Sequence, residues 1–176
     1  ACITVCDASD SVTFRVTKDP RSFASDAAID EWATTLNSVK GTLNEVLGTL
    51  EQARRSRAQI KALMDAFDNE RLHEMGDAAV AGIDAWESLI NQRRDETYAD
   101  ADAWETPLDG QLRYLMDVID ASGAPVTDGA RTRMRDLSVQ WEQRQNELRT
   151  LIADYIDPIN DWAGEMGVRY VVDPAL

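Results

Sequence analysis

The stretch DAAIDEWATTLNSVKGTLNEVLGTLEQARRSRAQIKALMDAF, residues 26–67, decides the fold of this chain. Its apolar residues recur at alternating steps of three and four: Ile29, Trp32, Leu36, Val39, Leu43, Val46, Leu50, Ala53, Ile60, Met64 and Phe67. This spacing places the side chains along one face of a helix and is typical of helices that pack side by side. Arg57 is the one charged residue on that stripe. At ~1.5 Å per residue, the stretch predicts a helix about 60 Å long.

A second helix is expected to run back along the first, after a break near Asp68-Asn69 or Gly76-Asp77. Its pattern fades through residues 93–106, and Pro107 interrupts it, because proline lacks the N–H that a helix interior needs. A shorter helix is predicted after Pro107. The residues expected to face the core of these two helices are Leu72, Met75, Ala79, Ile83, Trp86, Ile90, Thr97, Leu108, Leu112, Leu115, Met116 and Ile119.

The last long helix follows the loop ASGAPVT, residues 121–127. Thr127 or Asp128 is the expected N-cap, and Pro158 should kink the helix or restart it with Asp157 as a new cap. Its expected core residues are Met134, Leu137, Trp141, Leu148, Leu151, Tyr155, Ile159, Trp162 and Met166. Gly164 and Gly167 should end it.

The N-terminus has a different pattern. Residues 2–6 (CITVC) and 12–17 (VTFRVT) are rich in β-branched residues and alternate in polarity, and the turn-rich DASDS lies between them. They predict a β-hairpin that ends before Asp19-Pro20. Val12, Phe14 and Val16 would then face the core of a β-domain.

Together these patterns predict a mainly α fold. We expect an elongated antiparallel three-helix, coiled-coil-like bundle with a middle leg broken at Pro107 and a short N-terminal β-hairpin. The predicted organisation is a hairpin over residues 1–21, the remnant of a preceding β-sandwich, a helical bundle over 22–167 and an extended tail over 168–176.

The composition limits the function. The net charge is −14, and a surface of this sign repels nucleic acid and anionic membrane surfaces. We expect neither a nucleic-acid partner nor membrane insertion, and the chain carries no targeting signal. The abundance of carboxylates fits either an ordinary acidic bundle or adaptation to high salt.

The two cysteines, Cys2 and Cys6, lie too close in sequence to bridge along a strand. Four residues of strand span about 13 Å, whereas the Cα atoms of a disulfide lie within about 7 Å. They therefore form no bond with each other unless the chain turns between them, and their redox state stays open.

His73 is the only histidine, in the sequence ERLHE at residues 70–74. The spacing of Glu70 and His73 occurs in di-metal helical bundles, but those sites need a second such motif, which the chain lacks. A hydrolytic triad would also have to use His73, and no nucleophile elbow accompanies it. We therefore expect no catalytic, cofactor-binding or metal site and no cofactor.

Three segments occur in an order that resembles a known family: FRVTKDPR (14–21), PLDGQLRYLMDVIDASGAPVTDGARTRMRDL (107–137) and IDPINDWAGEMGV (156–168). The chain resembles the C-terminal helical region of bacterial sortilin-like BNR-repeat β-propeller proteins, which are described as glycosyl-hydrolase-like or sialidase-like. The likeness covers nearly the whole chain. In the family pattern an asparagine commonly follows the leucine that matches Leu108, whereas Asp109-Gly110 stand here.

The resemblance implies a non-catalytic helical packing or interaction module at the C-terminus of a larger propeller protein, whose active residues lie outside this chain. It also implies a secreted, periplasmic or cell-surface location, with the upstream propeller and β-sandwich of the same polypeptide as partner. The alternative is a self-standing protein–protein interaction domain that forms a homodimer through the N-terminal hairpin. An enzyme that uses acid pairs or His73 is a third hypothesis.

Overall fold

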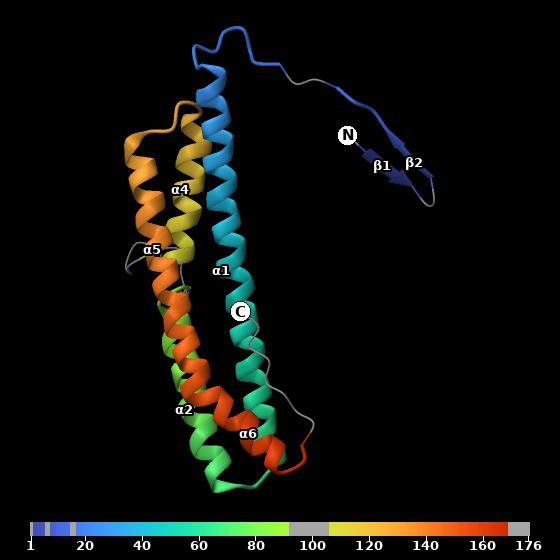
Figure 1. The fold of residues 1–176 in the computed structure, drawn as a ribbon, viewed down its shortest axis with the longest axis vertical. Helices are drawn as coiled ribbons and strands as arrows, with labels where there is room; N and C mark the ends of the chain where they lie inside the picture. The colour runs from blue at the N-terminus through green and yellow to red at the C-terminus, as the bar shows by residue number, and fades with distance from the viewer. Residues whose placement is uncertain (1, 6–7, 15–16, 92–105, 169–176) are drawn as a thin grey trace, which may run out of the picture.

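The computed structural model describes residues 2–5, 8–14, 17–91 and 106–168. This part of the chain is mainly helical, so the predicted fold class is confirmed at that level. The longest element, α1, covers Asp26–Ala66, and the other helices lie alongside it (Figure 1). None of the described helices combines the length and the apolar character that crossing a membrane requires.

Polar side chains cap the N-termini of both α1 and α2. Ser25 starts α1, because its Oγ accepts a hydrogen bond from the N–H of Ala28 at 3.2 Å. After Phe67, the Oδ1 of Asn69 accepts from the N–H of Leu72 at 3.0 Å and starts α2, Glu70–Ser88. Of the two predicted breaks, the one at Asp68-Asn69 is therefore correct.

The next two helices also begin and end where local chemistry directs. Helix α4, Leu108–Ser122, starts directly after Pro107. It ends at Gly123, whose φ of 65° falls in the left-handed region that glycine adopts without strain. Helix α5, Asp128–Leu151, starts at Thr127, whose Oγ1 accepts from the N–H of Ala130 at 3.2 Å.

The helices share one hydrophobic core along α1. Helix α4 lies beside the N-terminal part of α1, helix α2 lies beside its C-terminal part, and α5 packs against both α2 and α4 (Figure 1). Each fully buried aliphatic side chain contributes about 1.5–3 kcal/mol through its removal from water. The largest fully buried apolar side chains are Leu50, Ile60, Leu72, Ile83, Ile90, Leu112, Ile119, Leu137, Ile156 and Ile159.

The predicted stripe on α1 holds best in the middle of the helix. Val39, Leu43, Val46, Leu50 and Ala53 are all buried there. Towards the C-terminal end the buried position moves by one residue: Leu63 is buried, whereas Met64 is only half-buried. This shift occurs where α2 has replaced α4 as the neighbour of α1.

A π-helical turn separates α5 from the last helix. The segment η1 covers Ile152–Ile156 and leads directly into α6, Asp157–Glu165. The wider turn accommodates Pro158, which has no N–H to donate and whose ring would crowd the carbonyl four residues earlier. Asp157 is the first residue of α6 and does not cap it through its side chain, so the predicted capping role is wrong.

The π turn also changes which residues face the core. Tyr155, predicted to be buried, is 41% exposed, and Ile156 is buried in its place at 1%. A π turn contains one more residue than an α turn, so side chains beyond it shift by one position. Met166, also predicted in the core, is exposed because α6 ends at Glu165, before Gly167 with its φ of 68°.

Two short strands lie near the N-terminus. Strand β1, Cys2–Val5, pairs antiparallel with β2, Ala8–Ser11, with Cys2 opposite Ser11 and Val5 opposite Ala8. The prediction of the second strand at residues 12–17 is therefore wrong, since residues 12–14 lie beyond β2 and form no strand. β2 begins three residues after β1 ends, so the pairing starts earlier in the chain than the β-branched pattern indicated. Among the described elements, the strands contact each other and no helix.

Several sequence predictions fall outside the described residues. These are the placements of Cys6, Val16 and Thr97 and of the tail from residue 169 onward. The predicted lack of a bond between Cys2 and Cys6 therefore stays a prediction.

Candidate functional site

His73 lies half-buried in the first turn of α2. Its backbone N–H donates to the carbonyl oxygen of Asn69 at 3.0 Å, which is an ordinary helix-start contact. Within the ranges that the structure describes, no three His, Cys, Asp or Glu side chains lie together as metal ligands would. The Glu70/His73 spacing thus gathers no further ligand there.

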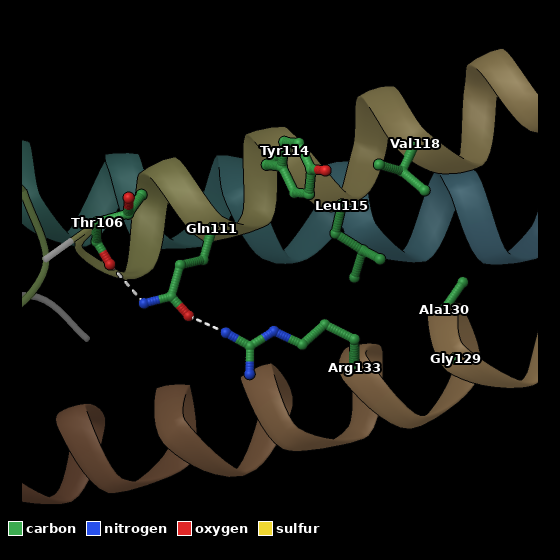
Figure 2. Close-up of a pocket in the computed structure, with 8 residues that line it drawn as sticks. All are labelled: Thr106, Gln111, Tyr114, Leu115, Val118, Gly129, Ala130 and Arg133. Atoms are coloured by element: carbon green, nitrogen blue, oxygen red, sulfur yellow. Dashed lines mark hydrogen bonds between the residues drawn. The ribbon is translucent and has the colours of Figure 1, made fainter. Parts of the chain in front are cut away.

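One hollow of the described surface lies between α4 and α5. This α4–α5 groove has a cavity volume of about 500 Å³. Gln111, Tyr114, Leu115 and Val118 line it from α4, at positions three or four apart that share one helix face, and Thr106 lies just before that helix. Gly129, Ala130 and Arg133 line it from the first turns of α5 (Figure 2).

The two ends of the α4–α5 groove differ in polarity. Near Val118 and Ala130 the lining is apolar, whereas polar groups meet at the end near Thr106 (Figure 2). There the side-chain amide of Gln111 donates to the carbonyl oxygen of Thr106, and its oxygen accepts from the guanidinium of Arg133. This chain of two hydrogen bonds crosses from α4 to α5.

A second hollow, of about 310 Å³, adjoins the first. Thr106 and Gln111 line both, so their hydrogen bond stands between them. The second hollow extends towards Leu89 after the end of α2 and towards Arg144 on α5. The surface between α5 and its neighbours is therefore divided into two compartments.

A cluster of charges surrounds a buried carboxylate where α1 meets α2. Glu87 is 0% exposed, and its two carboxylate oxygens accept hydrogen bonds from Arg54 and Arg57, each at 2.7 Å. Arg57 also pairs with Asp84. We name Arg54, Arg57, Asp84 and Glu87 the Glu87 cluster.

The contacts within the Glu87 cluster are those of a structural ion-pair network. Both oxygens of Glu87 accept hydrogen bonds from permanently charged guanidinium groups, so both are occupied by contacts within the protein. Burial by itself would lower the pKa of Arg57, but its hydrogen bond to Asp84 and the charge of Glu87 outweigh that effect and raise the pKa. Arg57 therefore stays charged at neutral pH.

The cluster also reaches the start of α4. Arg54 donates to the Oδ1 of Asn91 at 3.2 Å, and the amide of Asn91 donates to the Oδ2 of Asp109 at 2.9 Å. The backbone N–H of Asp109 in turn bonds the carbonyl oxygen of Ile90 at 3.1 Å. One polar network therefore ties α1, the end of α2 and the start of α4 together.

The segment from residue 12 to residue 23 carries large apolar side chains in water. Val12 and Phe14 are 65% and 64% exposed, and Phe23 is fully exposed. The described residues of this N-terminal arm lead from the start of α1 to the strand pair, which stands apart from the helices (Figure 1). Large contiguous apolar patches on a protein surface often mark contacts with other molecules, whereas single exposed apolar side chains are common.

Within the Glu87 cluster and the α4–α5 groove, the sequence singled out one residue, Arg57, and did not indicate the others as parts of a site. Arg57 stood out as the one charge on the α1 stripe, and its ion pairs now explain that position. Glu87 was missed, although it is an acid beside Trp86 on the apolar stripe of α2. The α4–α5 groove was also missed, because Leu115 was expected inside and Tyr114 and Val118 carry no pattern that separates a groove from an ordinary helix surface.

Comparisons with known proteins identify no relative of the chain: no family model, curated protein or solved structure matches it.

Proposed function

We propose that this chain is a non-catalytic helical interaction module that packs against a β-rich domain through its N-terminal arm. The observation that carries the proposal is the exposure of Val12, Phe14 and Phe23. Val12 and Phe14 are two residues apart in a segment without helix, so their side chains can lie on one face of an extended chain. Burial of each such side chain would contribute about 1.5–3 kcal/mol to association.

In this proposal the helices act as a rigid support, an elongated antiparallel three-helix bundle. Helix α1 is one leg, α2 and α4 placed end to end form the broken middle leg, and α5 with η1 and α6 is the third. The contacts of α1 and of α5 with both α2 and α4 support this arrangement. The Glu87 cluster and Asp109 hold the break in the middle leg in place.

The partner is proposed from the resemblance to BNR-repeat propeller proteins. In that setting the arm would contact the β-sandwich ahead of it in the same polypeptide, and any glycan chemistry would belong to the propeller. The module would then be secreted, periplasmic or on the cell surface.

A second function is dimerisation through the strand pair. The sheet has only two strands, β1 and β2, so each keeps one edge that pairs with nothing in the described part of the chain. An isolated two-stranded sheet is marginal in water, and edge pairing with a second copy would complete it. A mass measurement by light scattering over a range of concentrations separates this function from the first.

The proposal is tested by replacing the apolar side chains of the arm. The variant Val12→Ser/Phe14→Ser/Phe23→Ser should change the free energy of unfolding by less than about 0.5 kcal/mol, because exposed substitutions rarely cost more. Its affinity for the β-rich domain encoded ahead of it, supplied as a separate chain, should fall by roughly 100-fold or more. Titration calorimetry measures the affinity, and urea denaturation measures the stability.

A matched control keeps this result specific. Val139→Ser and Tyr155→Ser also remove exposed apolar groups, but from the helices, and should leave the affinity unchanged. If the arm variant bound the β-rich domain as tightly as the unmodified chain does, the proposal would be contradicted. A reading frame that encodes no β-rich domain ahead of this chain would also contradict it. A large loss of stability would show instead that the arm packs on its own helices.

A further inference from the structure

We propose that the α4–α5 groove binds a carboxylate with an unbranched apolar tail, such as a medium-chain fatty acid, and that Arg133 holds the carboxylate. The proposal does not depend on the N-terminal arm. It rests on the shape of the groove, on its division into an apolar and a polar end, and on the charge of Arg133.

The apolar end can hold a hydrocarbon tail. Leu115 and Ala130 form its floor and are buried, Val118 borders it, and Gly129 contributes no side chain. A cavity of about 500 Å³ lies in the size range of small-molecule sites, which are mostly apolar with a few fixed polar groups. From Gln111 to Val118 the helix rises by ~10 Å, which matches a tail of medium length.

The polar end offers a positive charge. The guanidinium of Arg133 donates one hydrogen bond to Gln111, and its remaining N–H groups are available, since no described acid forms an ion pair with it. Its neighbours on α5 differ: Arg131 pairs with Glu31 and Asp128, and Arg144 pairs with Glu147. Guanidinium groups bind carboxylates through two parallel hydrogen bonds, so a single carboxylate suits Arg133.

Other occupants fit less well. An amphipathic helix needs a groove that continues over several turns, but the hydrogen bonds through Gln111 divide this surface (Figure 2). A ligand with several phosphate charges would meet one arginine and the repulsion of a chain with a net charge of −14. A ligand with one carboxylate needs only one arginine, meets less of this repulsion, and its tail does not have to cross the hydrogen bonds of Gln111.

The head group is tested with three probes of equal chain length: decanoate, decanol and decylamine, each below the concentration at which it forms micelles. Titration calorimetry on the full chain should show saturable binding of decanoate, at least about 10-fold tighter than decylamine. Arg133→Gln should weaken decanoate binding about 10-fold and leave decanol within about twofold. Arg135→Gln, which removes an exposed arginine from the same helix outside the groove, is the matched control and should change neither.

The location is tested with Gly129→Leu. Apart from the helix's own backbone and the adjacent residues, no heavy atom lies within 4 Å of a Cβ built on Gly129, which lines the groove, so a side chain at this position begins in open space there. Decanoate and decanol binding should both fall at least about 10-fold, while the thermal midpoint stays constant or rises, because leucine favours a helix over glycine. This variant therefore separates blocked binding from misfolding.

Three results would overturn the proposal. The first is no saturable decanoate binding by the unmodified chain, the result expected if something else fills the groove. The second is an affinity for decylamine or decanol equal to that for decanoate. The third is decanoate binding that survives Gly129→Leu or falls equally in Arg135→Gln, because the ligand would then lie elsewhere.

Discussion

Glu87→Ala should lower the free energy of unfolding by about 3–5 kcal/mol, because it removes the buried carboxylate that pairs with Arg54 and leaves Arg57 with Asp84 as its remaining partner. Glu87 is 0% exposed, and the side chain of Arg57 beside it is only 15% exposed, so water has little access to the Arg57 guanidinium. Arg54 would also lose its bond to Glu87, and the link to Asn91 would be weakened. Urea denaturation followed by far-UV circular dichroism measures the change.

Two controls show whether burial causes this loss. Glu51→Ala removes an exposed ion pair between two residues of α1, Glu51 and Arg55. It should cost less than about 1 kcal/mol. The variant Arg54→Met/Arg57→Met/Glu87→Met removes Glu87 together with both of its arginine partners, while Asp84, whose side chain is 43% exposed, stays hydrated. It should recover most of the stability lost in Glu87→Ala, since apolar replacements of a buried ion pair are often neutral. A triple variant as unstable as Glu87→Ala would contradict the electrostatic explanation.

The Glu87 cluster also shows how far the sequence predicts this fold. The period of the apolar residues on α1 predicts a long helix and a core, because burial of one face follows directly from spacing. The same pattern treats Arg57 as an interruption. Its ion pairs with Asp84 and Glu87 come from residues 27 and 30 positions away, and no local pattern reports such a separation.

The sequence also did not determine the local backbone conformation at Pro158 or the position of the second strand. Pro158 predicts a disturbance of the last helix, but a kink, a new cap and a π turn all accommodate a proline. The π turn at η1 moved the buried position from Tyr155 to Ile156, so one undetermined backbone choice misplaced a core residue. At the N-terminus, the β-branched residues after Ser11 favoured a strand there, whereas the short connection placed β2 before them.

The second large effect is expected at the two buried tryptophans of α2 and α5. Trp86→Ala and Trp141→Ala should each cost about 3–5 kcal/mol, because both rings are 4% exposed and each substitution leaves a cavity. The two indoles differ in their hydrogen bonds. The Nε1–H of Trp86 donates to the carbonyl oxygen of Arg144 at 2.8 Å, whereas that of Trp141 is buried without a partner among the described residues.

Phenylalanine substitutions separate the hydrogen bond from the packing. Both Trp86→Phe and Trp141→Phe lose similar ring volume, but only Trp86→Phe also breaks a hydrogen bond, which costs about 1 kcal/mol. Trp141→Phe removes an unpaired buried N–H, and relief of that penalty, about 1–3 kcal/mol, offsets part of the lost packing. Trp86→Phe should therefore be the less stable variant by at least about 1 kcal/mol in urea denaturation. If both phenylalanine variants lost the same free energy of unfolding, the Trp141 indole would have a hydrogen-bond partner in solution. The two tryptophans would then not differ in their hydrogen bonding.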